Sequence, residues 1–168
     1  MAVVPFNIES ICDKKDLITR YVHIFREFAI ATDKYIIVKW VFEEPLEMPP
    51  SVTAISVKPS LFNQMVNREF WLSREHKTIM CKIHTSIQPI DFVILESEVY
   101  LKLMGFFKTF DDMPADGVTA KLTEQGFDII KSIYKFFKGN DLVFESLGEK
   151  RPTRISFDGD KRFMLYYI

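Results

Sequence analysis

Hydrophobic positions recur every three or four residues between residues 13 and 30. This spacing places them on one face of a helix, and Asp13 is suited to cap its first turn. The face consists of Leu17, Ile18, Tyr21, Ile24, Phe25 and Phe28. The pattern therefore predicts a helix over 13–30, with His23 on its solvent-facing side.

Runs of β-branched and aromatic residues predict strands at 34–42, 51–58, 77–87 and 141–146. The Asp158-Gly159 pair predicts a hairpin at the end of the chain. An odd number of loop residues is favoured there, because it aligns Ile155 and Phe157 with Phe163 and Leu165.

The remaining segments are less regular. Prolines and glutamates at 43–50 and aspartates at 111–117 predict loops, and Pro59 begins a short helix that reaches about residue 72. The apolar residues of 90–110 fit both the period of a helix and the period of a strand. A short helix at 89–96 followed by a strand at 98–109 is favoured. A second main helix is predicted over 119–138, where Gly139 follows the last turn.

Strands and helices do not alternate regularly, which is typical of the α+β class. We therefore expect a single globular domain over 1–168. A mixed or antiparallel sheet carries the two main helices, at 13–30 and 119–138, packed on it. A small barrel like that of oligonucleotide-binding proteins, with added helices, is the alternative fold.

Composition narrows the functional classes. The 168 residues carry a net charge of −1, so the molecule as a whole does not attract nucleic acid or an anionic membrane. The two cysteines are too few for a disulfide framework and indicate a reducing compartment. The N-terminal segment does not resemble a signal peptide, and no apolar run approaches the length of a membrane span. We expect an intracellular protein, cytoplasmic or nuclear, that does not enter membranes.

The stretch 73–86 gathers His76, Cys81 and His84. On one strand Cys81 and His84 point to opposite faces, and His76 lies roughly 26 Å from His84. These three side chains therefore cannot share a metal ion, and Cys81 is interpreted as a small buried hydrophobic residue. We expect no metal and no cofactor.

Local motifs of catalysis are absent from the sequence, including the glycine-rich phosphate loops and the metalloprotease helix. Asp111, Asp112 and Asp116 cluster in one loop, which is interpreted as a solvated acidic loop. An enzyme whose site is assembled from distant segments remains an open reading.

Large apolar side chains occupy both faces of two predicted strands, which indicates either a central strand or a surface covered by a partner. The leading hypothesis is a non-catalytic interaction or assembly domain that binds another protein or its own copy. The expected contact residues are Met164, Tyr166, Ile168, Tyr35 and Ile37.

The C-terminal hairpin also mixes basic and aromatic residues, which are the components of single-strand binding. The alternative hypothesis is therefore a module that binds single-stranded nucleic acid. Its contact residues would be Lys150, Arg151, Arg154, Lys161 and Arg162.

Overall fold

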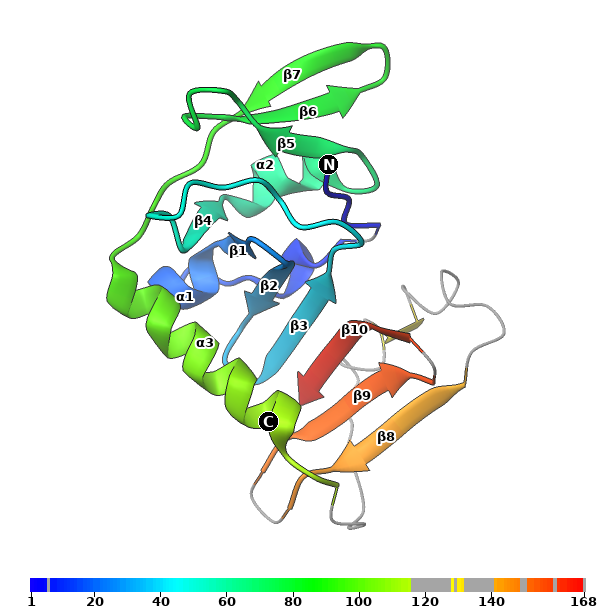
Figure 1. Ribbon diagram of the computed structural model, residues 1–168. Coiled ribbons are helices and arrows are strands. Elements are labelled where there is room, and N and C mark those ends of the chain that lie inside the picture. Colours follow the sequence, from blue (N-terminus) through cyan, green and yellow to red (C-terminus); the bar gives the residue numbers. More distant parts are fainter. Residues whose placement is uncertain are drawn as a thin grey trace.

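The computed structural model describes residues 1–5, 7–115, 128, 130–131, 141–148, 151–158 and 160–167, without the side chains of 10, 106–109, 160, 161 and 167. Two antiparallel sheets organise this part of the chain (Figure 1). The large sheet has the order β4-β1-β2-β3-β10-β9-β8, and the small sheet has the order β5-β6-β7. The prediction of an α+β fold with an antiparallel sheet is confirmed.

The strands of the large sheet are β1 (Val22–Phe25), β2 (Phe28–Thr32), β3 (Ile36–Val41), β4 (Ala54–Val57), β8 (Leu142–Ser146), β9 (Thr153–Phe157) and β10 (Asp160–Tyr167). Those of the small sheet are β5 (Phe70–Leu72), β6 (Ile79–Ile83) and β7 (Ser86–Ile90). The helical segments are η1 (Glu9–Ile11), α1 (Leu17–Arg20), α2 (Pro59–Phe62), η2 (Asn63–Met65) and α3 (Ser97–Asp112).

The helix predicted over 13–30 is wrong. Only the short α1 is helical there, and Asp16 rather than Asp13 caps it, accepting from the backbone N–H groups of Ile18 and Thr19. The chain then forms β1 and β2, which pair with each other. Both strands lie inside the sheet and are covered on both faces, so nearly all their residues are buried. Such strands lose the alternation that identifies a strand in a sequence.

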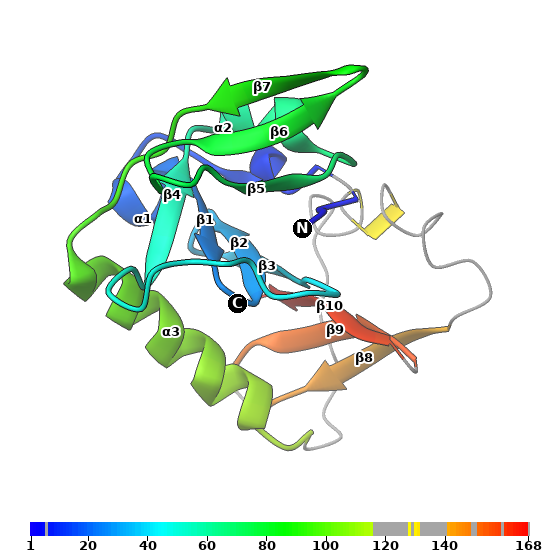
Figure 2. The same ribbon diagram turned by 45° about the horizontal axis from the view of Figure 1, so that its top comes forward.

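Helix α3 packs across one face of the large sheet (Figures 1 and 2). Its Tyr100, Leu103 and Phe110 form a hydrophobic cluster with Ile37 of β3 and Tyr166 of β10. The strand favoured at 98–109 and the short helix favoured at 89–96 are therefore wrong. The helical spacing of these three residues decided the outcome, and the helix ends before Pro114, which disfavours helical geometry at Met113.

The main hydrophobic core covers the opposite face of the large sheet. The N-terminal segment, α2, η2 and the small sheet contribute to it, for example through Val4, Phe62, Met65 and Phe70. The N-terminal segment connects the two sheets. The backbone of Ala2 pairs with Phe70 of β5, while the carbonyl of Val3 accepts from the Trp40 indole on β3.

The C-terminal hairpin forms as β9 and β10. Phe157 pairs with Asp160, as in a two-residue loop, but the register then shifts, and Leu165 pairs with Ile155. The prediction of an odd number of loop residues is therefore wrong. The expected alignment of apolar residues is still found, because the irregularity in β10 brings Ile155 and Leu165 to the same buried face.

The single strand predicted over 77–87 is also wrong in its extent. The chain turns at His84 and Thr85, so that β6 and β7 form a hairpin closed by the pair Ile83 and Ser86. His84 has a φ of 55°, in the left-handed region. No glycine marks this turn in the sequence, which is why periodicity alone missed it.

The second main helix, predicted over 119–138, lies almost wholly outside the described residues. Of this segment only Asp128, Ile130 and Lys131 are described, and Ile130 is buried in the main core. In the described part, β4 and β8 are the two edges of an open sheet, which does not match the barrel alternative. None of the described helices is both long and apolar enough to cross a bilayer.

Candidate functional site

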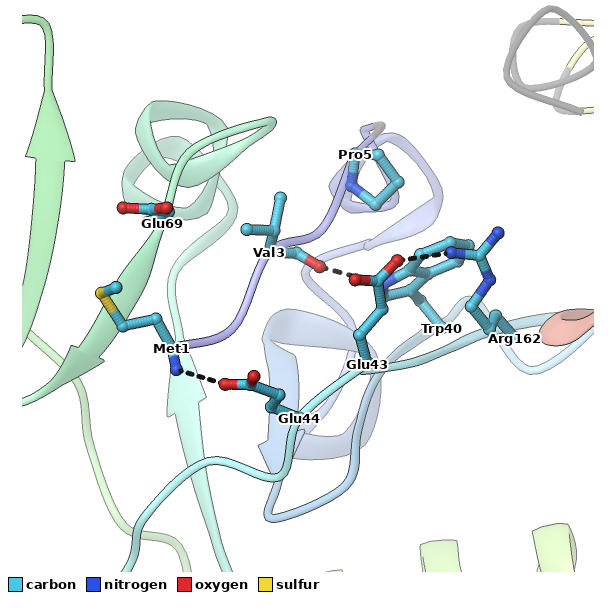
Figure 3. A pocket seen from close by; sticks show the side chains of 8 residues that line it. All are labelled: Met1, Val3, Pro5, Trp40, Glu43, Glu44, Glu69 and Arg162. Carbon is cyan, nitrogen blue, oxygen red and sulfur yellow. Dashed lines mark hydrogen bonds and ion pairs between the residues drawn. The ribbon is translucent and has the colours of Figure 1, made fainter.

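A hollow of about 520 Å³ lies where the N-terminal segment, the end of β3, the residue before β5 and β10 meet (Figure 3). It is lined by Met1, Val3, Pro5, Trp40, Glu43, Glu44, Glu69 and Arg162. A second hollow of about 360 Å³ shares Met1 and Glu44 with it, and adds Pro45, Leu46, Glu47, Trp71 and Leu72. We call the two together the glutamate hollow.

Trp40 and Arg162 form the wall of the first hollow. The Trp40 indole N–H donates to the Val3 carbonyl over 2.9 Å, and the ring is 5% exposed. The Arg162 guanidinium carbon lies 5.3 Å from the Trp40 ring centre, and its Nη1 donates to Glu43 Oε1 over 2.8 Å. The ring face and the carboxylate thus bind one guanidinium together, as Figure 3 shows.

Four carboxylates gather at the glutamate hollow: Glu43, Glu44, Glu47 and Glu69. Glu43 pairs with Arg162, and Glu44 Oε2 lies 3.5 Å from the Met1 amine. Glu47 and Glu69 form no ion pair with any described residue. The hollow therefore carries an excess of negative charge.

The loop that presents three of these glutamates is fixed by its alternate residues. Leu46 and Met48 are buried in the main core, while Glu43, Glu44 and Glu47 point outward. Leu46 N–H donates to the Arg26 carbonyl over 2.7 Å, and an Arg26 Nη donates to the Met48 carbonyl over 3.1 Å. Prolines restrict the rest of this loop, so the backbone that carries these carboxylates is preorganised.

The sequence interpretation treated the loop 43–50 only as a connection and missed this site. Two signals were available. Three glutamates fall within five positions at 43–47, and both tryptophans of the chain line the hollows. The distance between Trp40 and Trp71 in the sequence concealed that the fold brings them to neighbouring hollows.

The residues predicted to contact a partner do not share one surface. Tyr166 and Ile37 are buried together beneath α3, and Met164 packs at the edge of the same cluster. Tyr35 is 64% exposed in the turn before β3, and Ile168 lies outside the described residues. Strand β10 is thus apolar on both faces because it is central in the sheet.

The basic residues of the C-terminal hairpin are partly engaged in structural contacts. Arg154 Nε donates to Glu145 Oε2 over 2.8 Å, and its Nη1 donates to three carbonyls at the end of α3. Arg162 covers Trp40, and Arg151 is exposed. Lys150 and the side chain of Lys161 lie outside the described part of the structure.

His23 is buried, which corrects the prediction that it faces solvent. Its Nε2 hydrogen bonds with the Ile18 carbonyl over 2.8 Å, so Nε2 carries the proton and Nδ1 accepts from the Ser56 hydroxyl over 2.8 Å. Ser56 in turn accepts from the Tyr100 hydroxyl over 2.8 Å, and Tyr100 accepts from the Leu95 N–H over 3.0 Å. Burial lowers the pKa of His23, against the opposing effect of the Ile18 carbonyl.

This chain of hydrogen bonds resembles a serine–histidine pair, but it is closed to solvent. His23 is 0% exposed and Ser56 and Tyr100 are 1% exposed each. Neither Ser56 nor His23 lines either hollow described above. The network satisfies buried polar groups between β1, β4 and α3.

The residues of the 73–86 stretch are separated by the fold. Cys81 is 0% exposed, as predicted, and burial raises the pKa of its thiol. His76 and His84 occupy two exposed turns. Asp111 forms an ion pair with Lys39 and accepts a hydrogen bond from the Tyr166 hydroxyl. Asp116 lies outside the described residues. No group of three metal-binding side chains occurs among the residues that the structure describes.

Comparison with known proteins returned no matching family model, no matching curated protein and no matching solved structure.

Proposed function

We propose that this chain is a non-catalytic protein-binding module, and that its glutamate hollow receives an arginine-bearing segment of a partner protein. The observation that carries the proposal is the Arg162 side chain, which lies over Trp40 and binds Glu43. This internal contact is an example of the chemistry that the hollow offers to a guanidinium group.

The second hollow repeats this combination without an internal arginine. Trp71, Glu44 and Glu47 line it, and no basic side chain of the described residues stacks on Trp71. Planar guanidinium groups suit such a site, because they stack on indole rings and bind carboxylates through paired hydrogen bonds. Tryptophan and arginine are also the residues that contribute most at protein interfaces.

Charge supports a cationic partner. Glu47 and Glu69 are held at the hollow without an ion pair in the described part of the chain. A concave site with an excess of one charge concentrates the field and attracts the opposite charge. Single-stranded nucleic acid is a poorer candidate, because Arg154 and Arg162 are engaged by Glu145 and Glu43.

A binding role also agrees with the placement of the serine and histidine. Ser56 and His23 have the spacing of a nucleophile and a base, yet both are closed to solvent. Their position supports a structural function for the pair, whereas the glutamate hollow is open to a ligand.

Tryptophan fluorescence tests the proposal directly, because both tryptophans of the chain line the glutamate hollow. Short synthetic peptides with two arginines at varied spacing would be titrated, with matched glutamine peptides as the reference. We expect a shift in emission with arginine peptides only, and weaker binding as salt is raised. Light scattering would show whether a second copy of the chain supplies the segment.

Variants complete the test. Glu47→Gln with Glu69→Gln should weaken binding by about tenfold or more, because two charge-assisted contacts are removed. Glu98→Gln on the exposed face of α3 is the matched control and should bind as the native chain does. Equal affinity of the double variant, or no response to any arginine peptide at millimolar concentration, would reject the proposal.

A further inference from the structure

A third hollow, separate from the two that form the glutamate hollow, lies beside α1 and α2. It has a volume of about 560 Å³ and is lined by Cys12, Asp13, Lys14, Arg20, Tyr21, Lys58, Pro59 and Ser60. It shares no residue with the glutamate hollow. Three separate segments of the chain build it, and we call it the basic hollow.

Three basic residues, Lys14, Arg20 and Lys58, line this hollow. Arg20 Nη2 donates to the Lys14 carbonyl over 3.4 Å, which holds the guanidinium close to a second basic residue. Lys58 approaches from the end of β4. Lys14, Arg20 and Lys58 form no ion pair with any described residue. Three basic residues against one carboxylate give the lining an excess of positive charge, which would attract an anion.

The carboxylate that lines the hollow is already engaged. Asp13 Oδ1 accepts from the Thr19 hydroxyl over 2.6 Å and from the Lys15 N–H over 2.9 Å. Asp13 Oδ2 lies 3.8 Å from Lys15 Nζ. Asp13 thus organises the loop before α1, and the lining holds three basic residues against this one carboxylate.

The other walls are suited to an apolar or aromatic body. Tyr21 and Pro59 present carbon surface, and Ser60 adds a hydroxyl. Burial, followed by the charges of Glu9, Asp13 and Asp33, raises the pKa of Cys12 to about 12. Cys12 is therefore a neutral thiol at physiological pH and serves as wall rather than as nucleophile.

We infer that the basic hollow binds a phosphate monoester carried on a ring or a short apolar body. A phosphate monoester supplies close to two negative charges and three strong acceptor oxygens at neutral pH, which matches the three basic side chains. The ring or chain then packs against Tyr21 and Pro59. This inference is independent of the function proposed for the glutamate hollow.

Calorimetric titration with a graded set of probes separates these contributions. Phenyl phosphate offers charge and ring, inorganic phosphate offers charge alone, and phenol offers the ring alone. We expect phenyl phosphate to bind about tenfold more tightly than inorganic phosphate, because the ring removes apolar surface from water. We expect no measurable binding of phenol.

Arg20→Gln and Lys58→Gln should each weaken binding of phenyl phosphate by about tenfold, through loss of a charge-assisted contact. Both side chains are exposed, so these variants should keep the native circular dichroism spectrum. Lys82→Gln on the small sheet removes an exposed charge that does not line the hollow, and is the matched control. Unchanged affinity in both hollow variants would overturn the inference.

A lipid headgroup could supply the same phosphate chemistry, so sedimentation with phosphatidylcholine vesicles that contain phosphatidic acid forms a second arm. Binding to these vesicles that is lost in Arg20→Gln would assign a lipid as the source, whereas binding of phenyl phosphate alone would assign a soluble ligand. Either result supports a phosphate monoester site. Failure of both probes at millimolar concentration would overturn it.

Discussion

His23 Nδ1 lies 2.8 Å from Ser56 Oγ, and neither side chain is more than 1% exposed. Burial lowers the pKa of His23 in the folded protein, while the unfolded chain takes up a proton near pH 6.5. The unfolded state therefore binds more protons than the folded state as the pH falls below about 6.5, and stability decreases in that range.

We predict that the free energy of unfolding declines between about pH 6.5 and pH 5, and that His23→Asn removes most of this decline. The lowered pKa values of Asp13 and Asp16 act at a lower pH, since their unfolded values lie near 3.9. Urea titrations across this range provide the measurement. His84→Asn, at an exposed turn, should keep the native slope, and the same slope in His23→Asn would contradict the assignment.

The hydroxyl of Tyr100 joins α3 to the same network. We predict that Tyr100→Phe costs about 1–2 kcal/mol, because the Leu95 N–H loses its acceptor and Ser56 loses a donor. In a double-mutant cycle with Ser56→Ala, a coupling of at least about 0.5 kcal/mol is expected. Tyr35→Phe serves as the exposed control. Strictly additive effects would show that the two hydroxyls do not interact.

Arg154 connects the C-terminal hairpin to the end of α3. Its side chain is 12% exposed, and it binds Glu145 and the carbonyls of Phe110, Asp111 and Met113. We predict that Arg154→Gln lowers the free energy of unfolding by about 2 kcal/mol or more, since a partly buried carboxylate and the helix carbonyls lose their donor.

Arg154→Lys tests the geometry of this contact. Lysine keeps the charge but cannot reach four acceptors with a planar fork, so it should recover only part of the lost stability. Arg151→Gln, at an exposed position nearby, should change stability by less than about 0.5 kcal/mol. A loss of nucleic-acid binding in Arg154→Gln with unchanged stability would contradict the structural role of this residue.

The sequence predicted the fold where alternation or a turn residue exposed the local geometry. The strands at 34–42, 51–58 and 141–146 appear as β3, β4 and β8, and Asp158 marks the terminal hairpin. It failed at 13–30, because β1 and β2 are buried on both faces and the turn at Arg26 and Glu27 carries no glycine or proline. A continuous apolar run fits a helix and a buried strand equally well.

The candidate site could not be derived from local patterns. Trp40 and Trp71 come from different sheets, and Arg162 reaches Glu43 across 119 positions of the sequence. His23 was misplaced because the expected helix gave it an exposed face. Only the fold brings its ring between β4 and α1, where it bonds with Ser56 and Ile18.

Tyr166 distinguishes a core role from a surface role for strand β10. Its side chain is 0% exposed, packs against Phe110 of α3 with ring centres 5.5 Å apart, and donates its hydroxyl to Asp111. Tyr166→Glu would place a second carboxylate beside Asp111 in this buried cluster. We predict that Tyr166→Glu lowers the free energy of unfolding by about 3–5 kcal/mol or prevents folding, as large core truncations do.

Tyr166→Phe keeps the ring and should cost only about 1 kcal/mol. Tyr35→Glu, on an exposed turn, should be neutral within about 0.5 kcal/mol. Denaturant titration of the three variants measures these changes and distinguishes the core role from the surface role. A folded Tyr166→Glu protein with native stability would mean that β10 is not covered by α3 in solution, and would restore this strand as a surface for a partner.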